Sequence, residues 1–270
     1  EFKENPNDKD IPVFKFFKNV DQEISPSLKN FLTNEVTIVH NNMKYEAVNP
    51  IKFYKGLDLG WSPIIQNLDS KRNLVDDIIL ENFIYEDITP KTKLQIMLIK
   101  SHAGAGKSVL LKRLAWDAAN EYSKLCIFIN DYADIDVMAL KELLSYCYKK
   151  VYLFIDNASR CITDLTKIVK SLGKESCKLS IIMTERTNVW NVSYEDRFQL
   201  PLQTYELKYL DYKEAGYLLD KLSENNSLGM LKNYSREEQL KKLLNNYGKQ
   251  LLVTLYEVTN GKKFEDIIKD

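Results

Sequence analysis

The sequence contains little histidine and cysteine, and it carries no excess charge of either sign. Its two histidines, and four cysteines without a Cys-x-x-Cys spacing, argue against a zinc site and favour a reduced chain with small buried thiols. Lysine plus arginine and aspartate plus glutamate both total 38, which gives a formal net charge of +0. We therefore expect no dedicated nucleic-acid surface and no anionic-membrane surface. No apolar run approaches the length of a membrane span and no signal peptide opens the chain, so we predict a cytoplasmic location.

The composition is otherwise that of a globular protein with a full core. Of 270 residues, 44% are hydrophobic and 28% are charged, which suits one large domain or two modest ones. The first residue is Glu1 rather than methionine, and we interpret the chain as a piece of a longer protein.

Strand and helix patterns alternate along the middle of the chain. Short apolar runs predict strands, and apolar residues at helical spacing predict helices between them. The predicted strands are 94–99, 125–129, 151–155, 179–183 and a fifth at 205–210, and the predicted helices are 108–122, 137–147 and 162–172. Such alternation predicts an α/β fold with a parallel β-sheet covered by helices on both faces. After Asp211 the pattern is helical only, with Asp211 and Glu214 placed for a capping box, and this predicts a small all-α domain.

A phosphate-binding loop, or P-loop, is predicted between the first of these strands and its helix. The segment Ser101-His102-Ala103-Gly104-Ala105-Gly106-Lys107-Ser108 places two glycines just before a lysine and a hydroxyl. The glycines let the backbone curl so that several N–H groups converge on phosphate oxygens, at the positive end of the next helix. Lys107 would reach the β- and γ-phosphates, and the Ser108 hydroxyl would bind Mg²⁺. The predicted ligand is ATP or ADP with Mg²⁺, held by Ala103, Gly104, Ala105, Gly106, Lys107, Ser108 and Val109.

The match to the P-loop pattern is incomplete. The pattern GxxxxGK[ST] would place glycine at position 101, where this chain has Ser101. The alternative is a chance Gly-Lys-Ser at a helix start, and the strand before the segment and the helix after it favour the P-loop. His102 either touches the nucleotide or is a loop histidine that faces solvent.

A carboxylate for the metal follows the third predicted strand. Asp156 comes directly after the apolar run 151–155, as in a Walker B motif, and is predicted to hold Mg²⁺. The next residue is Asn157, where many hydrolysing relatives carry a glutamate that polarises the attacking water. An amide can orient water but cannot accept its proton, so we expect slow ATP hydrolysis. Glu185 is either another base or an exposed structural carboxylate.

An arginine is predicted to detect the γ-phosphate. Arg186 follows the fourth predicted strand, at the carboxyl edge where open α/β sheets bind ligands. A guanidinium there could pair with the γ-phosphate, which makes Lys107, Asp156 and Arg186 the predicted catalytic residues. The alternative for Arg186 is a surface salt bridge. Arg160 is a weaker candidate because it lies at a helix start.

These motifs resemble the STAND class of signal-transducing NTPases, relatives of NACHT proteins and of plant and apoptotic regulators. The resemblance lies in residues 103–114, in Phe154-Ile155-Asp156-Asn157 and in Met183-Thr184-Glu185-Arg186. It extends to the segment around Tyr54 and Trp61, which resembles the one that packs on adenine. Residues 248–253 lie where the family's helical domain carries a Gly-x-Pro nucleotide contact, although this chain has no proline there.

The resemblance implies a domain organisation and a mechanism. Residues 1–50 would be a connecting arm, 51–203 the P-loop NTPase domain, and 204–270 a helical lid domain. Bacterial members often serve in antiphage defence, so covalently linked effector and sensor domains are expected outside this segment. ADP would bridge the two domains in a closed form. Exchange for ATP would place a γ-phosphate against Lys107 and Arg186, move the lid and allow a homo-oligomer to assemble.

Two other functions fit the same motifs. A motor or remodelling ATPase of the AAA+ kind would show rapid turnover and an arginine finger from a neighbouring subunit. A protein-interaction module with a degenerate P-loop would not bind nucleotide. The regulatory ATP/ADP switch is our leading hypothesis because of Asn157 and the trailing helices.

Overall fold

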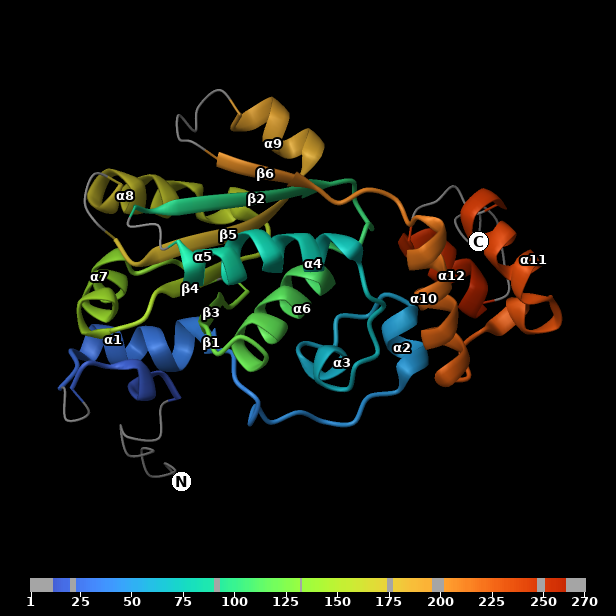
Figure 1. Cartoon of the computed structure of the whole chain (residues 1–270), viewed down its shortest axis with the longest axis horizontal. Helices are drawn as coiled ribbons and strands as arrows, with labels where there is room; N and C mark the ends of the chain where they lie inside the picture. The colour runs from blue at the N-terminus through green and yellow to red at the C-terminus, as the bar shows by residue number, and fades with distance from the viewer. Residues whose placement is uncertain are drawn as a thin grey trace. The chain divides into compact units, whose positions relative to one another are not determined.

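The computed structural model describes residues 12–19, 23–89, 93–131, 133–173, 177–195, 202–246 and 251–260. Within these residues, six strands form one sheet in the order β1-β3-β4-β5-β2-β6 (Figure 1). The strands are β1 (Val36–Ile38), β2 (Gln95–Ser101), β3 (Leu125–Ile129), β4 (Val151–Ile155), β5 (Leu179–Arg186) and β6 (Leu202–Glu206). β3, β4 and β5 pair in parallel, and β1 pairs antiparallel with β3. The predicted α/β class is confirmed, with helices only after the last strand.

Twelve α-helices lie in the described part of the chain. They are α1 (Pro26–Asn30), α2 (Pro50–Tyr54), α3 (Ser62–Ile65), α4 (Asn73–Ile79), α5 (Tyr85–Ile88), α6 (Lys107–Asn120), α7 (Val137–Tyr146), α8 (Ile162–Leu172), α9 (Thr187–Ser193), α10 (Tyr212–Glu224), α11 (Arg236–Lys241) and α12 (Leu251–Asn260). The predicted bounds of β3, β4 and α8 are confirmed. The strand predicted at 205–210 begins and ends earlier, as β6, because Leu210 belongs instead to the core of the helices that follow.

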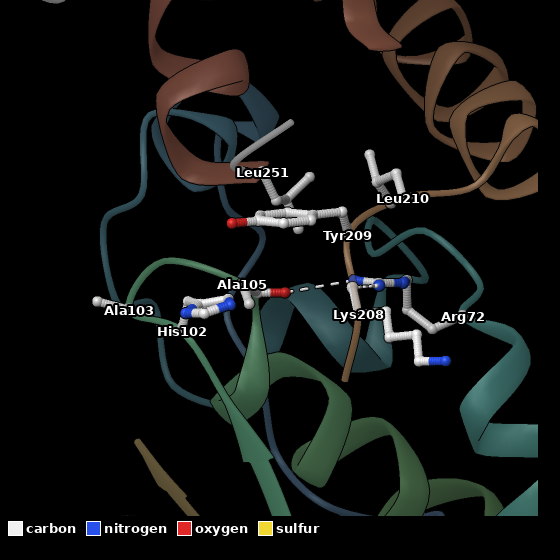
Figure 2. A pocket seen from close by; sticks show the side chains of 8 residues that line it. All are labelled: Arg72, His102, Ala103, Ala105, Lys208, Tyr209, Leu210 and Leu251. Atoms are coloured by element: carbon white, nitrogen blue, oxygen red, sulfur yellow. Dashed lines mark hydrogen bonds between the residues drawn. The ribbon is translucent and has the colours of Figure 1, made fainter. Parts of the chain in front are cut away.

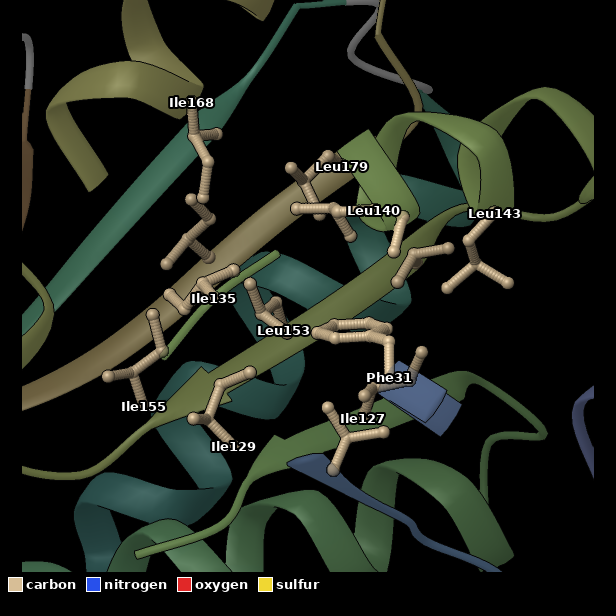
Figure 3. Close-up of a cluster of buried hydrophobic side chains, with 14 of the residues drawn as sticks. Phe31, Ile127, Ile129, Ile135, Leu140, Leu143, Leu153, Ile155, Ile168 and Leu179 are labelled. Atoms are coloured by element: carbon tan, nitrogen blue, oxygen red, sulfur yellow. The ribbon is translucent and has the colours of Figure 1, made fainter. Parts of the chain in front are cut away.

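The strands form because nearly all of their side chains are removed from water. Every residue of β3 and β4 is buried, as expected for a parallel sheet with both faces covered. On one face, Ile127 and Leu153 join a cluster with Leu140 of α7 and Ile168 of α8 (Figure 3). On the other face, the Tyr152 ring packs on Phe83, with 4.7 Å between the ring centroids. Burying each such aliphatic side chain stabilises the fold by about 1.5–3 kcal/mol. The core therefore holds the strands, and the residues at their ends, in place.

The chain divides by its contacts into two compact units. The first, called the sheet unit, consists of Glu1–Met43, Ile79–Lys100 and Leu114–Tyr205. The second, called the helical unit, consists of Lys44–Ile78, Ser101–Arg113 and Glu206–Asp270, and it therefore contains the predicted P-loop. The helical unit has its own apolar core, in which residues of α10 pack with Tyr54, Leu240 and Val258.

Two further features follow from the sequence. The predicted capping box begins α10: the Asp211 side chain accepts from the Glu214 N–H at 2.8 Å, and the Glu214 side chain accepts from the Asp211 N–H at 3.3 Å. All four cysteines are free and buried, as predicted, and burial raises the pKa of Cys126, Cys147 and Cys161. In the described residues, no helix combines the length and apolarity needed to cross a membrane.

Candidate functional site

The predicted P-loop joins the end of β2 to the start of α6. Gly104 has φ +72° and Gly106 has φ +89°, values in the left-handed region that glycine adopts without strain. Side chains of α12 lie against the same two residues. A Cβ on Gly106 would lie 3.1 Å from Leu251 Cδ2, and one on Gly104 would lie 3.1 Å from Leu252 Cβ. The positive φ angles favour glycine at both positions, and the nearby leucines leave little room for a Cβ, so this backbone can serve as a phosphate cradle.

The Lys107 ammonium is turned toward the loop itself. Lys107 is 8% exposed, and its Nζ donates to the Ser101 hydroxyl at 3.1 Å and to the His102 carbonyl at 2.8 Å. Ser101 stands where the P-loop pattern has glycine, and its hydroxyl supplies one of these acceptors. A polyphosphate offers such an ammonium stronger, charged acceptors within the same loop. Ser108, the predicted Mg²⁺ ligand, is exposed in the first turn of α6.

Sequence reasoning missed two residues that lie beside the P-loop. The Arg72 guanidinium donates from Nη1 to the Ala105 carbonyl at 3.3 Å (Figure 2). The Tyr209 ring stacks on His102, with 5.5 Å between the centroids and 13° between the planes. A space of about 10 Å³, enough for one water molecule, lies among these residues and Leu251. His102 is exposed, as the solvent-facing alternative predicts, and it is also stacked.

Asp156 lies directly beyond β4, where the sequence predicted it. In the described residues, its side-chain hydrogen bonds go to Oδ1, which accepts from the Thr184 hydroxyl and from the Asn157 N–H at 3.1 Å. These bonds orient the carboxylate and leave the Oδ2 lone pairs for a metal or its water. Asn157 itself has φ +54°, a conformation that asparagine tolerates better than most residues. A hollow of about 220 Å³ borders Asp156 and is also lined by Asp134, Asn130 and Arg160.

Glu185 is buried rather than exposed, which corrects one of the two alternatives given for it. The residue is 2% exposed near the end of β5. Its Oε2 accepts from the Ser159 N–H at 2.8 Å, and its Oε1 accepts from the Arg186 N–H at 2.7 Å. Both oxygens therefore bond main-chain donors that shape the turn after β4 and the start of α9. This arrangement uses the carboxylate as a structural acceptor.

The two arginines considered as sensors have different surroundings. Arg186 is exposed at the end of β5. Arg160 pairs with Asp131 at 3.0 Å and also donates to the Asp156 carbonyl at 3.4 Å. The Arg160 side chain thus supports the turn that carries Asp156, whereas the role of Arg186 stays a prediction.

The segments predicted to contact the base lie in the helical unit. Tyr54 is 1% exposed in its core, and the hydroxyl donates to the Leu68 carbonyl at 2.9 Å; burial raises the pKa of this phenol. Trp61 is half-buried just before α3. Residues 248–250 lie outside the described part of the chain. The next residues begin α12, and the Leu252 N–H donates to the Gly104 carbonyl at 3.1 Å.

The donor set fits a nucleotide phosphate and a hard cation. Two glycines with positive φ and a buried ammonium suit phosphate oxygens. A serine hydroxyl and an oriented carboxylate are oxygen ligands of the kind that Mg²⁺ prefers. Ser108 belongs to the helical unit and Asp156 to the sheet unit, and each offers an oxygen of this kind.

Several solved structures resemble this chain, all at low identity. Caenorhabditis elegans PCH-2 is 14% identical with a TM-score of 0.41, covering 77% of this chain and 64% of that chain. A mutant of Thermotoga maritima RuvB is 11% identical with a TM-score of 0.46, covering 74% and 65%. Saccharomyces cerevisiae Hsp104, in the extended conformation of its casein complex, is 11% identical with a TM-score of 0.51, covering 84% and 40%. The chain thus spans less than two thirds of each of these chains, and such likeness concerns the fold alone.

A search of curated proteins finds no match. A comparison with protein families gives a positive result that agrees with the resemblance seen in the motifs. The family described as Novel STAND NTPase 5 matches residues 51–198, more than half of the chain, and the chain therefore belongs to this family of STAND NTPases.

Proposed function

We propose that this chain is a regulatory module that binds ATP and ADP and hydrolyses ATP slowly. The observation that carries the proposal is Asn157, which follows the Walker B aspartate where a hydrolytic glutamate would stand. An NTPase without that base keeps its nucleotide for long periods, as a switch requires. Asp156 is oriented by Thr184 and can still serve the metal, so binding and slow turnover are compatible.

Each predicted site residue has a role in this proposal. The amides from Ala103 to Val109 hold the phosphates, and Lys107 supplies the positive charge between the β- and γ-phosphates. Ser108 and Asp156 hold Mg²⁺, and Arg186 pairs with the γ-phosphate and so distinguishes ATP from ADP. Tyr54 and Trp61 lie in the segment that would flank the base.

The hydrogen bonds that Glu185 accepts support slow hydrolysis. A general base must accept a proton from water in the transition state. Glu185 already accepts hydrogen bonds from two main-chain N–H groups, and moving it would leave those donors unpaired at a cost of about 1–3 kcal/mol each. Glu185, the carboxylate on the strand that pairs with β4, is thus engaged in holding the backbone.

The wider role belongs to the same proposal. We propose that residues 51–203 and 204–270 are the NTPase and helical lid domains, and that residues 1–50 connect them to the rest of a longer cytoplasmic protein. Effector and sensor domains joined to this module would act in antiviral defence. ATP binding would favour a homo-oligomer, and ADP a resting form.

The test of nucleotide binding is the Lys107→Ala variant, with Lys112→Ala as its matched control. Lys112 lies in the same helix but pairs with Asp58 at 3.4 Å. We expect Lys107→Ala to weaken ADP and ATP about 100-fold or more in calorimetric titrations, because a charge-assisted phosphate contact contributes about 3 kcal/mol. Lys112→Ala should bind as the wild type does. Wild-type affinity in Lys107→Ala would show that the phosphates are not held by this loop.

Turnover separates the switch from the other candidate functions. We expect phosphate release to be slow, and mass spectrometry of the purified protein to find bound ADP or ATP. Rapid turnover over many cycles would favour a remodelling ATPase of the AAA+ kind. Absence of any nucleotide-induced rise in melting temperature would favour an interaction module.

A further inference from the structure

Arg72 is a buried arginine that the proposed function does not use. It precedes α4 in the helical unit and is 7% exposed. Burying a guanidinium is costly unless its donors are engaged, so its partners indicate what the residue does. They are the Ala105 carbonyl, the Lys208 carbonyl and the Glu214 carboxylate.

The first partner connects Arg72 to the outer side of the P-loop. When the N–H groups of such a loop converge on phosphate, the carbonyl groups of the same peptides point away from it. Two successive carbonyls of this loop are held from outside. Gly104 O accepts from the Leu252 N–H at 3.1 Å, and Ala105 O accepts from Arg72 Nη1 at 3.3 Å. Rotating either peptide, and so turning an amide away from the phosphates, breaks one of these bonds.

The other partners connect the same guanidinium to α10. Nη2 donates to the Lys208 carbonyl at 2.7 Å, in the segment that leads into the helix. Nε lies 3.2 Å from Glu214 Oε1. Glu214 is the acidic residue of the α10 capping box, and its Oε1 also accepts from the Asn73 N–H at 2.9 Å. The first turn of α10 is therefore joined to the P-loop through one planar side chain. Figure 2 shows the part of this connection that involves Arg72, Ala105 and Lys208.

We propose that Arg72 is a positioning residue for nucleotide binding, which holds the P-loop peptides in their phosphate-binding orientation and couples that orientation to the first turn of α10. This inference rests on the proposed function, because it assigns a regulatory contact to the same loop. A bound polyphosphate favours the peptide orientation in which Ala105 O meets Arg72. The guanidinium is then fixed, and Glu214 and the helix cap are fixed with it. Loss of nucleotide frees the peptide and loosens the cap.

The geometry requires arginine rather than any cation. Its rigid fork directs separate N–H groups at acceptors that lie in different directions, which a single ammonium cannot reach together. Arg72→Lys keeps the charge opposite Glu214 and removes the fork. Arg113→Lys is a matched control, because Arg113 also lies in the helical unit and also combines an ion pair, to Asp69, with a carbonyl contact, to Ile64 O at 2.9 Å.

The experiment combines nucleotide release with hydrogen exchange in the full chain. A fluorescent ADP analogue measures the dissociation rate, and exchange of the Glu214 and Ala215 amides reports the α10 cap. We expect Arg72→Lys to release ADP about 10-fold faster and to lose the slowing of exchange that ADP causes in the wild type. Arg113→Lys should keep the wild-type release rate and the slowing of amide exchange by ADP, even if its melting temperature falls as far as that of Arg72→Lys. Glu214→Gln should retain ADP better than Arg72→Lys does, but ADP should no longer slow the exchange of the α10 cap amides.

The outcomes distinguish this inference from the function on which it rests. A wild-type chain that binds no ADP removes the proposed function and the inference together. A wild-type chain that binds ADP, with Arg72→Lys releasing it at the same rate, overturns the inference alone. Equal acceleration in Arg72→Lys and Arg113→Lys also overturns it, because a general loss of stability would then explain both.

Discussion

The P-loop and the ends of β4 and β5 keep their candidate ligand groups in place by different means. In the loop, backbone dihedral angles decide the geometry, and donors outside the loop hold its carbonyls. At the strand ends, side chains hold each other and the adjoining turn, as Thr184 holds Asp156 and Glu185 holds the Ser159 N–H. The loop should therefore be most sensitive to an added Cβ, and the strand ends to a removed polar atom.

Among the substitutions that test this contrast between loop and strand ends, the largest effect is expected from Gly106→Ala, which adds one carbon atom to the loop. At φ +89° an alanine is strained, and its Cβ would lie 3.1 Å from Leu251 Cδ2. The loop should relax into a conformation in which its N–H groups no longer converge on the phosphate oxygens. We expect ADP affinity to fall about 30-fold in calorimetric titrations, the equivalent of about 2 kcal/mol of backbone strain.

Gly60→Ala supplies the comparison that this prediction needs. Gly60 has φ +64° in the same unit, and a Cβ there would meet no atom within 4 Å. We expect it to lower stability by about 1 kcal/mol and to leave ADP affinity unchanged. If Gly106→Ala and Gly60→Ala bound ADP equally well, the left-handed glycine of the P-loop would not be what shapes the phosphate site.

A smaller effect is expected from Thr184→Val, which removes a hydroxyl at constant shape. Thr184 is buried on β5 and donates to Asp156 Oδ1. Its loss frees the carboxylate to rotate and should raise the Mg²⁺ concentration needed for half-maximal ATP binding about 10-fold, as expected for one charge-assisted hydrogen bond. Binding of ADP without Mg²⁺ should not change.

Ser180→Ala is the control for that variant. Ser180 is buried on the same strand, and its hydroxyl bonds Gln95 at 3.1 Å instead of Asp156. We expect normal Mg²⁺ dependence. A Thr184→Val variant with normal Mg²⁺ dependence would mean that the Asp156 carboxylate needs no support from β5.

The same contrast explains how far the sequence could predict the site. Gly104, Gly106 and Asp156 could be proposed from the sequence because local patterns carry them: glycines before a helix, and an acid after a buried strand. Arg72 was missed because its acceptors, such as the Lys208 carbonyl 136 positions away, come together only in the folded chain. The exposed alternative for Glu185 was wrong for a similar reason, since no sequence pattern places the Ser159 amide beside it.

Helix caps extend the comparison to a site outside the predicted nucleotide contacts. Asp211 caps α10 together with Glu214 and also accepts from Asn73 Nδ2 at 2.8 Å. Asp136 caps α7 in the sheet unit, where its carboxylate accepts from the Met138 and Ala139 N–H groups and from the Ser27 hydroxyl. The Ser27 and main-chain bonds lower the pKa of Asp136, because they favour its ionised form.

The smallest effect is therefore expected from Asp136→Ala, about 1 kcal/mol of stability at pH 7 and no change in ADP affinity. Since the folded-state pKa lies below the ordinary value of 3.8, ionised Asp136 stabilises the fold above about pH 4 and loses this contribution as the pH falls. The melting-temperature difference between wild type and Asp136→Ala should then shrink between pH 7 and pH 3. Asp136→Asn keeps a neutral cap acceptor and should reduce the pH dependence while retaining most of the stability. A difference between wild type and Asp136→Ala that stayed constant over this range would show that the cap does not depend on charge.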